Sequence, residues 1–195
     1  YLISKYVLHK ENWIPTVMFV TMSASILASM VLPKLEAKFG KRNLFMHTSI
    51  LCAIPLFIIG FMPTMGMVGL SVLLVVFGFF YGLVSALPWA MVPDCIDFAQ
   101  WKYGVQPNGL FTATFTFIQK CATAIGGFLS GILLGFAGFI ANQEQSAQAL
   151  QMIINLRFFI PAVLFVLTIL ALYFYEITPK KTKEIAAELE KRNNN

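Results

Sequence analysis

The sequence has few charged residues and none of the motifs by which catalytic or nucleotide-binding chains are recognised. Asp, Glu, Lys and Arg together make up 12% of its 195 residues, about half of the share in soluble domains, whose surfaces face water. Hydrophobic residues make up 58%, so most side chains are expected to face lipid. The sequence holds no glycine-rich phosphate loop, Ser/His/Asp set or metal-ligand spacing. A nucleotide site for an ATP-driven pump would therefore have to lie on another chain.

Cysteine is also scarce. The three cysteines, Cys52, Cys95 and Cys121, are far apart in the sequence, which argues against a disulfide framework or a zinc site. We interpret them as small apolar residues within helices. The net charge of +5 does not indicate nucleic-acid binding, because the basic residues lie in short loops and near the C-terminus, where membrane topology explains them.

Long apolar runs dominate the rest, and five of them reach the length of about 20 residues that a membrane-spanning helix requires. The predicted spans are residues 13–32, 44–62, 67–92, 109–139 and 150–175. A shorter apolar run at residues 1–8 is typical of the last turns of a helix that begins before Tyr1. The sequence therefore predicts an all-α membrane protein, with a helical bundle over residues 1–177 and a tail over residues 178–195.

Basic residues occupy every second loop. They cluster between the first two spans, between the third and fourth, and in the tail, whereas the alternate loops hold few. The positive-inside rule therefore predicts that the basic loops and the C-terminus are cytoplasmic. In the tail, Thr178 and Pro179 are typical of a helix start, and we expect a short surface helix after them.

Small residues recur at four-residue spacing in two of the spans. One set is in the third span and the other in the fourth, and both let helix backbones approach closely in lipid. Such residues are compatible with two interpretations: helices that slide against their neighbours, or helices that pack statically. The residues are Gly78, Gly82, Ala86 and Ala90, and Gly127, Gly131 and Gly135.

One lysine lies deep within a predicted span. Lys120 is about 17 Å along the helix that starts at Gly109, at about 1.5 Å per residue, which places it near the middle of the bilayer. An uncompensated charge there costs at least about 2.5–3.5 kcal/mol. Thr112, Thr116 and Thr123 share its helix face, and such a polar stripe is typical of the wall of an aqueous cavity. The alternative is a structural ion pair with another helix.

Three other ionisable residues are candidates. Asp94 and Asp97 follow the third span, three residues apart, and share a face if the helix continues. They either bind a cation, pair with basic residues or are solvated. A paired acid/base role in hydrolysis is a further alternative, but no other residues typical of an active site accompany the two carboxylates. Arg157 lies near the outer start of the last span, within reach of the interface.

The segment from Leu87 to Gly104 reads LPWAMVPDCIDFAQWKYG, and the next helix contains Lys120. This Pro-Asp-x-x-Asp-aromatic pattern, with a lysine in the following helix, resembles the glycoside–pentoside–hexuronide:cation symporters of the major facilitator superfamily. The resemblance covers essentially the whole chain, as helices eight to twelve and the end of helix seven. A weaker match is the basic end of the superfamily's cytoplasmic loop motif at residues 38–42, where Ala37 replaces the usual Asp.

The resemblance implies roles for several of these residues. Asp94 and Asp97 match an acidic pair at the cytoplasmic end of helix ten, implicated in gating and coupling. Lys120 matches a lysine of the central cavity, and Thr116 matches a polar cavity residue. To the predicted substrate cavity we add Thr112, from the same stripe, and Trp89, which either stacks on a sugar ring or belongs to an interfacial aromatic belt.

The family implies symport of a glycoside, pentoside or hexuronide with sodium or a proton across the bacterial inner membrane. Its expected mechanism is rocking of two six-helix halves around a central site. The expected partners are therefore the sugar, the monovalent cation, the lipid bilayer and an N-terminal six-helix half that precedes this sequence and holds most of the cation site. No other cofactor, metal or nucleic acid is expected. Gln106 and Ser85 stand where the family has Arg and Trp, so the gating bridges and sugar contacts differ in detail.

Two other interpretations stay open at this point. A non-transporting membrane subunit, or a truncated remnant of such a transporter, gives no reason for Lys120 at mid-bilayer. A membrane-embedded enzyme using Asp94 and Asp97 requires an intramembrane catalytic constellation, which the sequence lacks. The sequence therefore predicts a transporter rather than an enzyme.

Overall fold

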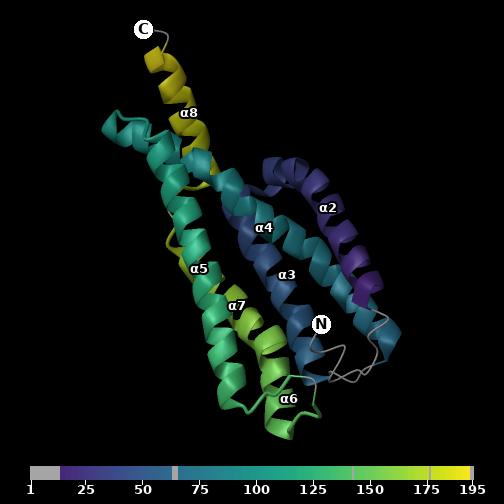
Figure 1. Cartoon of the computed structure of the whole chain (residues 1–195). Helices are drawn as coiled ribbons and strands as arrows, with labels where there is room; N and C mark the ends of the chain where they lie inside the picture. Colours follow the sequence, from purple (N-terminus) through teal and green to yellow (C-terminus); the bar gives the residue numbers. More distant parts are fainter. Residues whose placement is uncertain (1–13, 63–65, 142, 176, 194–195) are drawn as a thin grey trace.

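The computed structural model describes residues 14–62, 66–141, 143–175 and 177–193, which form helices and no strand (Figure 1). Among these residues, five stretches are long and apolar enough to cross a membrane. The predicted all-α membrane fold is therefore confirmed, while the predicted helix end at residues 1–8 lies outside the described residues. The helices are α2 (Ile14–Phe39), α3 (Lys41–Phe61), α4 (Met67–Tyr103), α5 (Asn108–Phe136), α6 (Ala147–Ile154), the π-helical turn η2 (Asn155–Phe159), α7 (Ile160–Tyr173) and α8 (Pro179–Asn193).

Two helices extend beyond the spans expected from the sequence, and both continue through a proline. α2 passes Pro33 and ends at Phe39, and α4 passes Pro93 and ends at Tyr103 rather than at Val92. A proline removes one helical hydrogen bond, but packing against neighbouring helices offsets that loss. In α4 the added turns pack against α8, so the polar segment after the apolar run is held in the helix by the C-terminal part of the chain.

The core lies between α3, α4 and α7. α3 packs against both of the other helices, and its Leu56 and Ile59 are buried with Phe77 of α4 and Ala162 of α7. A second buried cluster joins α2, α3 and α4. Figure 1 shows α3 in the interior of the bundle and α5 at its side. Within α5 no residue is buried, so this helix is the least supported part of the described fold.

The small residues of α4 form the contact with α2. A Cβ added to Gly78 would lie 2.6 Å from Thr21 Cγ2, and one added to Gly82 would lie 2.5 Å from the backbone oxygen of Ser25. Ser25 Oγ also donates a 2.7 Å hydrogen bond to the Gly78 carbonyl across this contact. Gly78 and Gly82 of the first set therefore let the backbones of α2 and α4 touch.

Replacing Gly82 with alanine is expected to lower the melting temperature of the purified protein in detergent. The new methyl group meets backbone atoms, so α2 and α4 must separate, and overpacking of this kind costs about 1–3 kcal/mol, with roughly 2–4 °C lost per kcal/mol. The matched control is Gly109→Ala, because a Cβ at Gly109 meets nothing within 4 Å. Equal melting temperatures for the two variants would contradict the tight α2–α4 contact.

Candidate functional site

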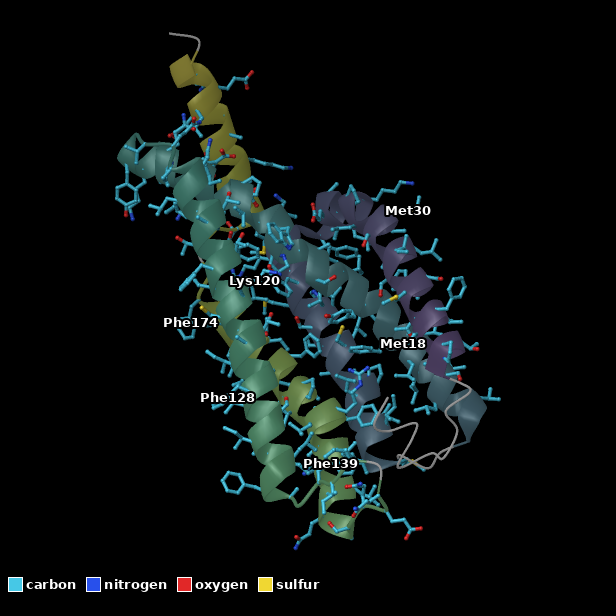
Figure 2. All side chains as sticks on the ribbon, viewed as in Figure 1. Met18, Met30, Lys120, Phe128, Phe139 and Phe174 are labelled. Carbon is cyan, nitrogen blue, oxygen red and sulfur yellow. The ribbon has the colours of Figure 1, made fainter. Side chains whose placement is uncertain are left out.

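Lys120 lies on an open face of α5, two residues before the midpoint of this 29-residue helix (Figure 2). Its side chain is exposed, and no other described residue forms a hydrogen bond or ion pair with it. The predicted polar stripe is present around it. Thr112 is exposed and Thr116 half-buried, and on an ideal helix Thr112, Thr116, Lys120 and Thr123 fall within about 80° of one another.

Two hydroxyl groups of the stripe use their protons within the helix. Thr116 Oγ1 donates to the Thr112 carbonyl at 2.8 Å, and Thr123 Oγ1 donates to the Gln119 carbonyl at 2.9 Å. Each oxygen therefore keeps lone pairs that can accept a hydrogen bond from a ligand. The stripe thus offers the strong donors of one ammonium beside hydroxyl acceptors.

Trp89 of α4 borders this stripe. Its ring is 46% exposed and meets the ring of Phe115 edge-on, with centroids 4.7 Å apart. Phe115 lies three residues after Thr112, on a neighbouring part of the α5 surface, so this contact places Trp89 beside the start of the stripe. Whether Trp89 stacks on a sugar stays a prediction.

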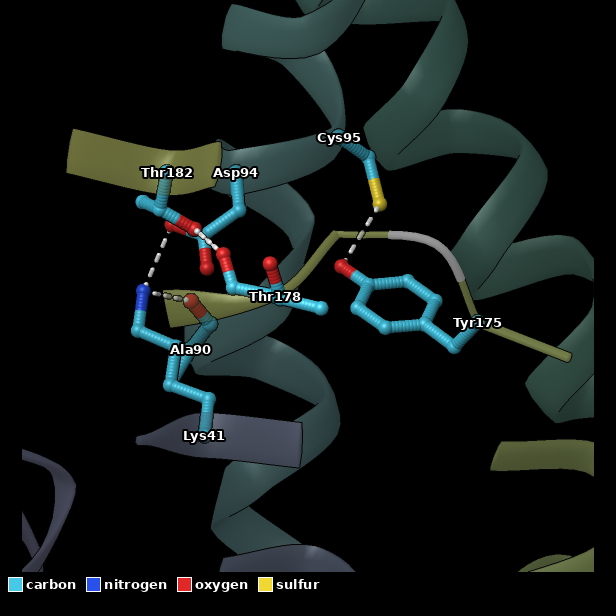
Figure 3. Close-up of polar contacts among 7 residues, drawn as sticks. All are labelled: Lys41, Ala90, Asp94, Cys95, Tyr175, Thr178 and Thr182. Carbon is cyan, nitrogen blue, oxygen red and sulfur yellow. Dashed lines mark hydrogen bonds and ion pairs between the residues drawn. The ribbon is translucent and has the colours of Figure 1, made fainter. Parts of the chain in front are cut away.

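A second group of polar residues lies at the end of the bundle drawn at the top of Figure 1. Here the start of α3, the last turns of α4 and the segment before α8 meet, and we call this the basic end; it is defined by Lys41, Arg42, Asp94 and Tyr175. Lys41 Nζ forms a 2.7 Å ion pair with Asp94 Oδ1 and donates to the Ala90 carbonyl at 2.8 Å (Figure 3).

The turn between α2 and α3 places Lys41 at this position. Gly40, between the two helices, has a φ of 76°, a left-handed conformation that favours glycine. Lys41 is therefore the first residue of α3 and reaches across to α4. Asp94 is 9% exposed, whereas the Lys41 side chain is 29% exposed, so the ion pair is shielded from water on its Asp94 side. Because α4 continues through both residues, Asp94 and Asp97 share a helix face as expected. Asp97 is half-buried, and the described residues give it no ion pair, so the two predicted gating carboxylates differ in their pairing.

Arg42 ties α3 to the end of α7. Its Nε donates to the Leu172 carbonyl at 3.0 Å and a terminal guanidinium nitrogen donates to the Tyr173 carbonyl at 2.8 Å. These carbonyls belong to the last turn of α7, where i+4 helical donors run out. The Leu172 carbonyl also accepts from the Tyr175 N–H at 3.1 Å, so Arg42 adds to the capping of that helix. Lys41 and Arg42 were not among the predicted site residues, although the weak match at residues 38–42 signalled a basic loop.

The C-terminal part of the chain also binds to α4. The Tyr175 hydroxyl lies 3.7 Å from Cys95 Sγ, and burial raises the pKa of the Tyr175 phenol, which therefore stays protonated at physiological pH. Trp101 Nε1 donates to the Glu188 carboxylate, and Lys181 Nζ lies 5.1 Å from the centroid of the Phe98 ring. The end of α4 is thus held by α3 on one side and by the tail on the other.

Arg157 is exposed and lies apart from these two groups, in η2. The π-helical turn ends two residues before Pro161, and the Ile160 N–H bonds to the Asn155 carbonyl. Arg157 therefore marks a local adjustment of the last span, and the structure does not bring it together with Lys120.

Comparisons with known proteins agree with an all-helical membrane transporter. The family model described as "MFS/sugar transport protein" matches residues 1–179. The chain is 29% identical over 192 residues to the "Putative sulfoquinovose importer" of Escherichia coli (strain K12), covering 98% of this chain and 41% of that protein. It is 30% identical over 190 residues to the "Isoprimeverose transporter" of Lactiplantibacillus pentosus, covering 97% of this chain and 39% of that protein.

A third relative is the "Glucuronide carrier protein homolog" of Escherichia coli (strain K12), which is 26% identical over 189 residues, 96% of this chain and 41% of the relative. The chain thus spans about two fifths of the length of these relatives. They are transporters rather than enzymes, as predicted, and with the five apolar helices they make this a multi-pass membrane protein. The resemblance seen in the sequence is confirmed, and the chain belongs to the MFS/sugar transport protein family.

Proposed function

We propose that this chain forms the C-terminal part of a symporter that moves a glycoside, pentoside or hexuronide together with sodium or a proton across the bacterial inner membrane. In this proposal the basic end faces the cytoplasm. The observation that supports the proposal most directly is Lys120 at the middle of α5, exposed beside threonine hydroxyls. A chain whose only role was scaffolding would place no such charge at mid-bilayer, because it costs at least about 2.5–3.5 kcal/mol in lipid.

The open face of α5 is the proposed wall of the substrate cavity, with Lys120, Thr116 and Thr112 on α5 and Trp89 on its border. A second six-helix half, supplied by residues before this sequence, would close the cavity on its other side. The two halves would then rock about the site to alternate access. The coupling cation would bind mainly in that other half.

The basic end supplies the proposed gating and coupling elements. The Lys41–Asp94 ion pair and the Arg42 cap lock the ends of α3, α4 and α7 together. Helix ends that are joined by such contacts move as one rigid unit, which a rocking mechanism requires. Asp97, one turn further along α4, is a candidate for contact with the other half rather than for the internal lock.

The function is tested by uptake in bacterial cells that express the complete reading frame encoding this chain. We expect radiolabelled uptake of at least one glycoside, pentoside or hexuronide above that of cells with an empty vector. An imposed sodium or proton gradient should drive accumulation, and the matching ionophore should abolish it. Uptake that proceeds equally without either gradient would contradict symport, and absence of uptake for every sugar would contradict sugar transport.

A further inference from the structure

The carboxylate of Glu36, in the last turn of α2, has an oxygen that the structure leaves without a donor. Glu36 Oε1 is buried and accepts no hydrogen bond. A buried acceptor that has lost its water without gaining a donor costs free energy, so such an oxygen requires an explanation. Because this chain itself covers the oxygen, a group outside the chain has no access to it in this conformation. The explanation therefore has to come from the residues beside Glu36.

Lys41 is a cation that acts on this carboxylate. The Glu36 carboxyl group is attracted by the charge of Lys41 and repelled by that of Asp94. A lysine ammonium has three donors, and Lys41 uses one on Asp94 Oδ1 and one on the Ala90 carbonyl. Among the described residues, one donor of Lys41 and one acceptor of Glu36 are therefore both unused.

The turn between α2 and α3 keeps Glu36 and Lys41 together. The Gly40 N–H donates to the Glu36 carbonyl at 2.8 Å, and Gly40 is in the left-handed conformation, with a φ of 76°. Glu36 and Lys41 thus lie on the two sides of one closed turn, whereas Asp94 belongs to α4. Pairing of Lys41 with Asp94 therefore depends on the position of α4, and pairing with Glu36 does not.

The end of α4 has a place at which it can move. Pro88 and Pro93 lie inside this helix, each proline removes a backbone hydrogen bond, and helix kinks form at such positions. Lys41 contacts both sides of Pro93, because Ala90 precedes it and Asp94 follows it. The tight contact between α2 and α4 lies before both prolines. Separation of Lys41 from Asp94 would thus free the end of α4 to pivot at Pro93.

We propose that Glu36 is a second partner for Lys41, which pairs with the ammonium when the end of α4 moves away from α3. Lys41 then pairs with Asp94 in one state of the basic end and with Glu36 in the other. A partly buried ammonium left without a carboxylate would oppose that movement, and transfer to Glu36 removes this obstacle. Glu36 is thus a positioning residue of the proposed gate, and this inference rests on the proposed transport function.

The first test measures the two states directly. Spin labels are attached at Asn43→Cys, near the start of α3, and at Tyr103→Cys, at the end of α4, because both residues are exposed. The complete protein encoded by the reading frame, with its other accessible cysteines replaced, is reconstituted in lipid vesicles, and pulsed electron paramagnetic resonance gives the label-to-label distances. We expect two distance populations. Glu36→Gln should leave only the population in which Lys41 pairs with Asp94, and Asp94→Asn should enrich the other.

The second test separates an exchange of partners from a static role of Glu36. Glu36→Gln should lower uptake of labelled methyl glucoside, methyl xyloside or methyl glucuronide, whichever the wild type transports, by about three- to tenfold, because one state loses a charge-assisted hydrogen bond. The melting temperature in detergent should not fall, since Glu36 Oε1 has no partner to lose in the observed state. Glu36→Asp should retain more uptake than Glu36→Gln. The control, Glu190→Gln, changes an exposed carboxylate of α8 and should match the wild type.

Two results would overturn the inference while leaving the proposed function intact. One is a distance distribution or an uptake rate that Glu36→Gln leaves unchanged. The other is a fall in the melting temperature of the Glu36→Gln variant that accounts for its lost uptake, which would assign Glu36 to static packing of the turn. Absence of uptake of every sugar by the wild type would instead contradict the transport function, while the distance measurement would still decide whether Lys41 changes its partner.

Discussion

Asp94→Asn is expected to reduce sugar uptake at least about tenfold. The substitution leaves Lys41 beside a neutral amide in a site where Asp94 is only 9% exposed, and a hydrogen bond to a charged group contributes about 1.5–3 kcal/mol. Because the ion pair joins the start of α3 to the last turns of α4, its loss loosens the proposed lock of the basic end. Initial uptake rates, normalised to protein in the membrane, measure the effect.

The matched control for this prediction is Asp97→Asn. Asp97 lies three residues along the same helix, is half-buried and forms no ion pair with the described residues, so we expect less than about a threefold loss. Exchanging the charges, Lys41→Asp with Asp94→Lys, should restore part of the uptake that either change removes alone. Equal losses of uptake for the Asp94 and Asp97 variants would show that uptake does not depend on the Lys41–Asp94 ion pair.

Gly131→Leu is expected to abolish most sugar uptake, again by at least about tenfold, without destabilising the bundle described above. A Cβ at Gly131 meets nothing within 4 Å, and the residue is exposed, so the larger side chain is added on an open face of the described helices. Small residues in membrane helices serve close approach of a neighbouring helix, and the open face of α5 is where the proposed second half would pack. The leucine side chain would prevent the proposed second half from packing closely against α5.

Two measurements separate this effect from a folding defect. The melting temperature of the variant in detergent should stay within a few degrees of the wild type, while uptake falls. Leu129→Phe is the control, because Leu129 is a large exposed side chain on α5, at 49% exposure, where lipid tolerates another apolar group. Normal uptake by Gly131→Leu would indicate that the glycine face borders lipid and not a protein surface.

The five spans could be predicted from the sequence because run length and hydropathy alone decide whether a segment crosses a membrane. The end of α4 could not. The residues after Pro93 are mixed in polarity, and their helix depends on α8 and on Lys41, which are distant in the sequence. A local pattern contains no information about such contacts.

Only part of the candidate site could be predicted from the sequence, for the same reason. Lys120 stood out because a charge within an apolar run is unusual, and the structure places it on the expected helix with its threonines. Lys41 was missed as the partner of Asp94 because 53 residues separate them, and Arg42 as a cap because the carbonyls it binds are 130 and 131 residues away.

The bare surface of α5 has a consequence for how the protein is made. A helix with no buried residue enters the bilayer on its own hydropathy, while its contacts with α4 and α6 leave Lys120 exposed. Insertion and assembly are thus separate events for this segment, because a charge at this depth disfavours the lipid-exposed state.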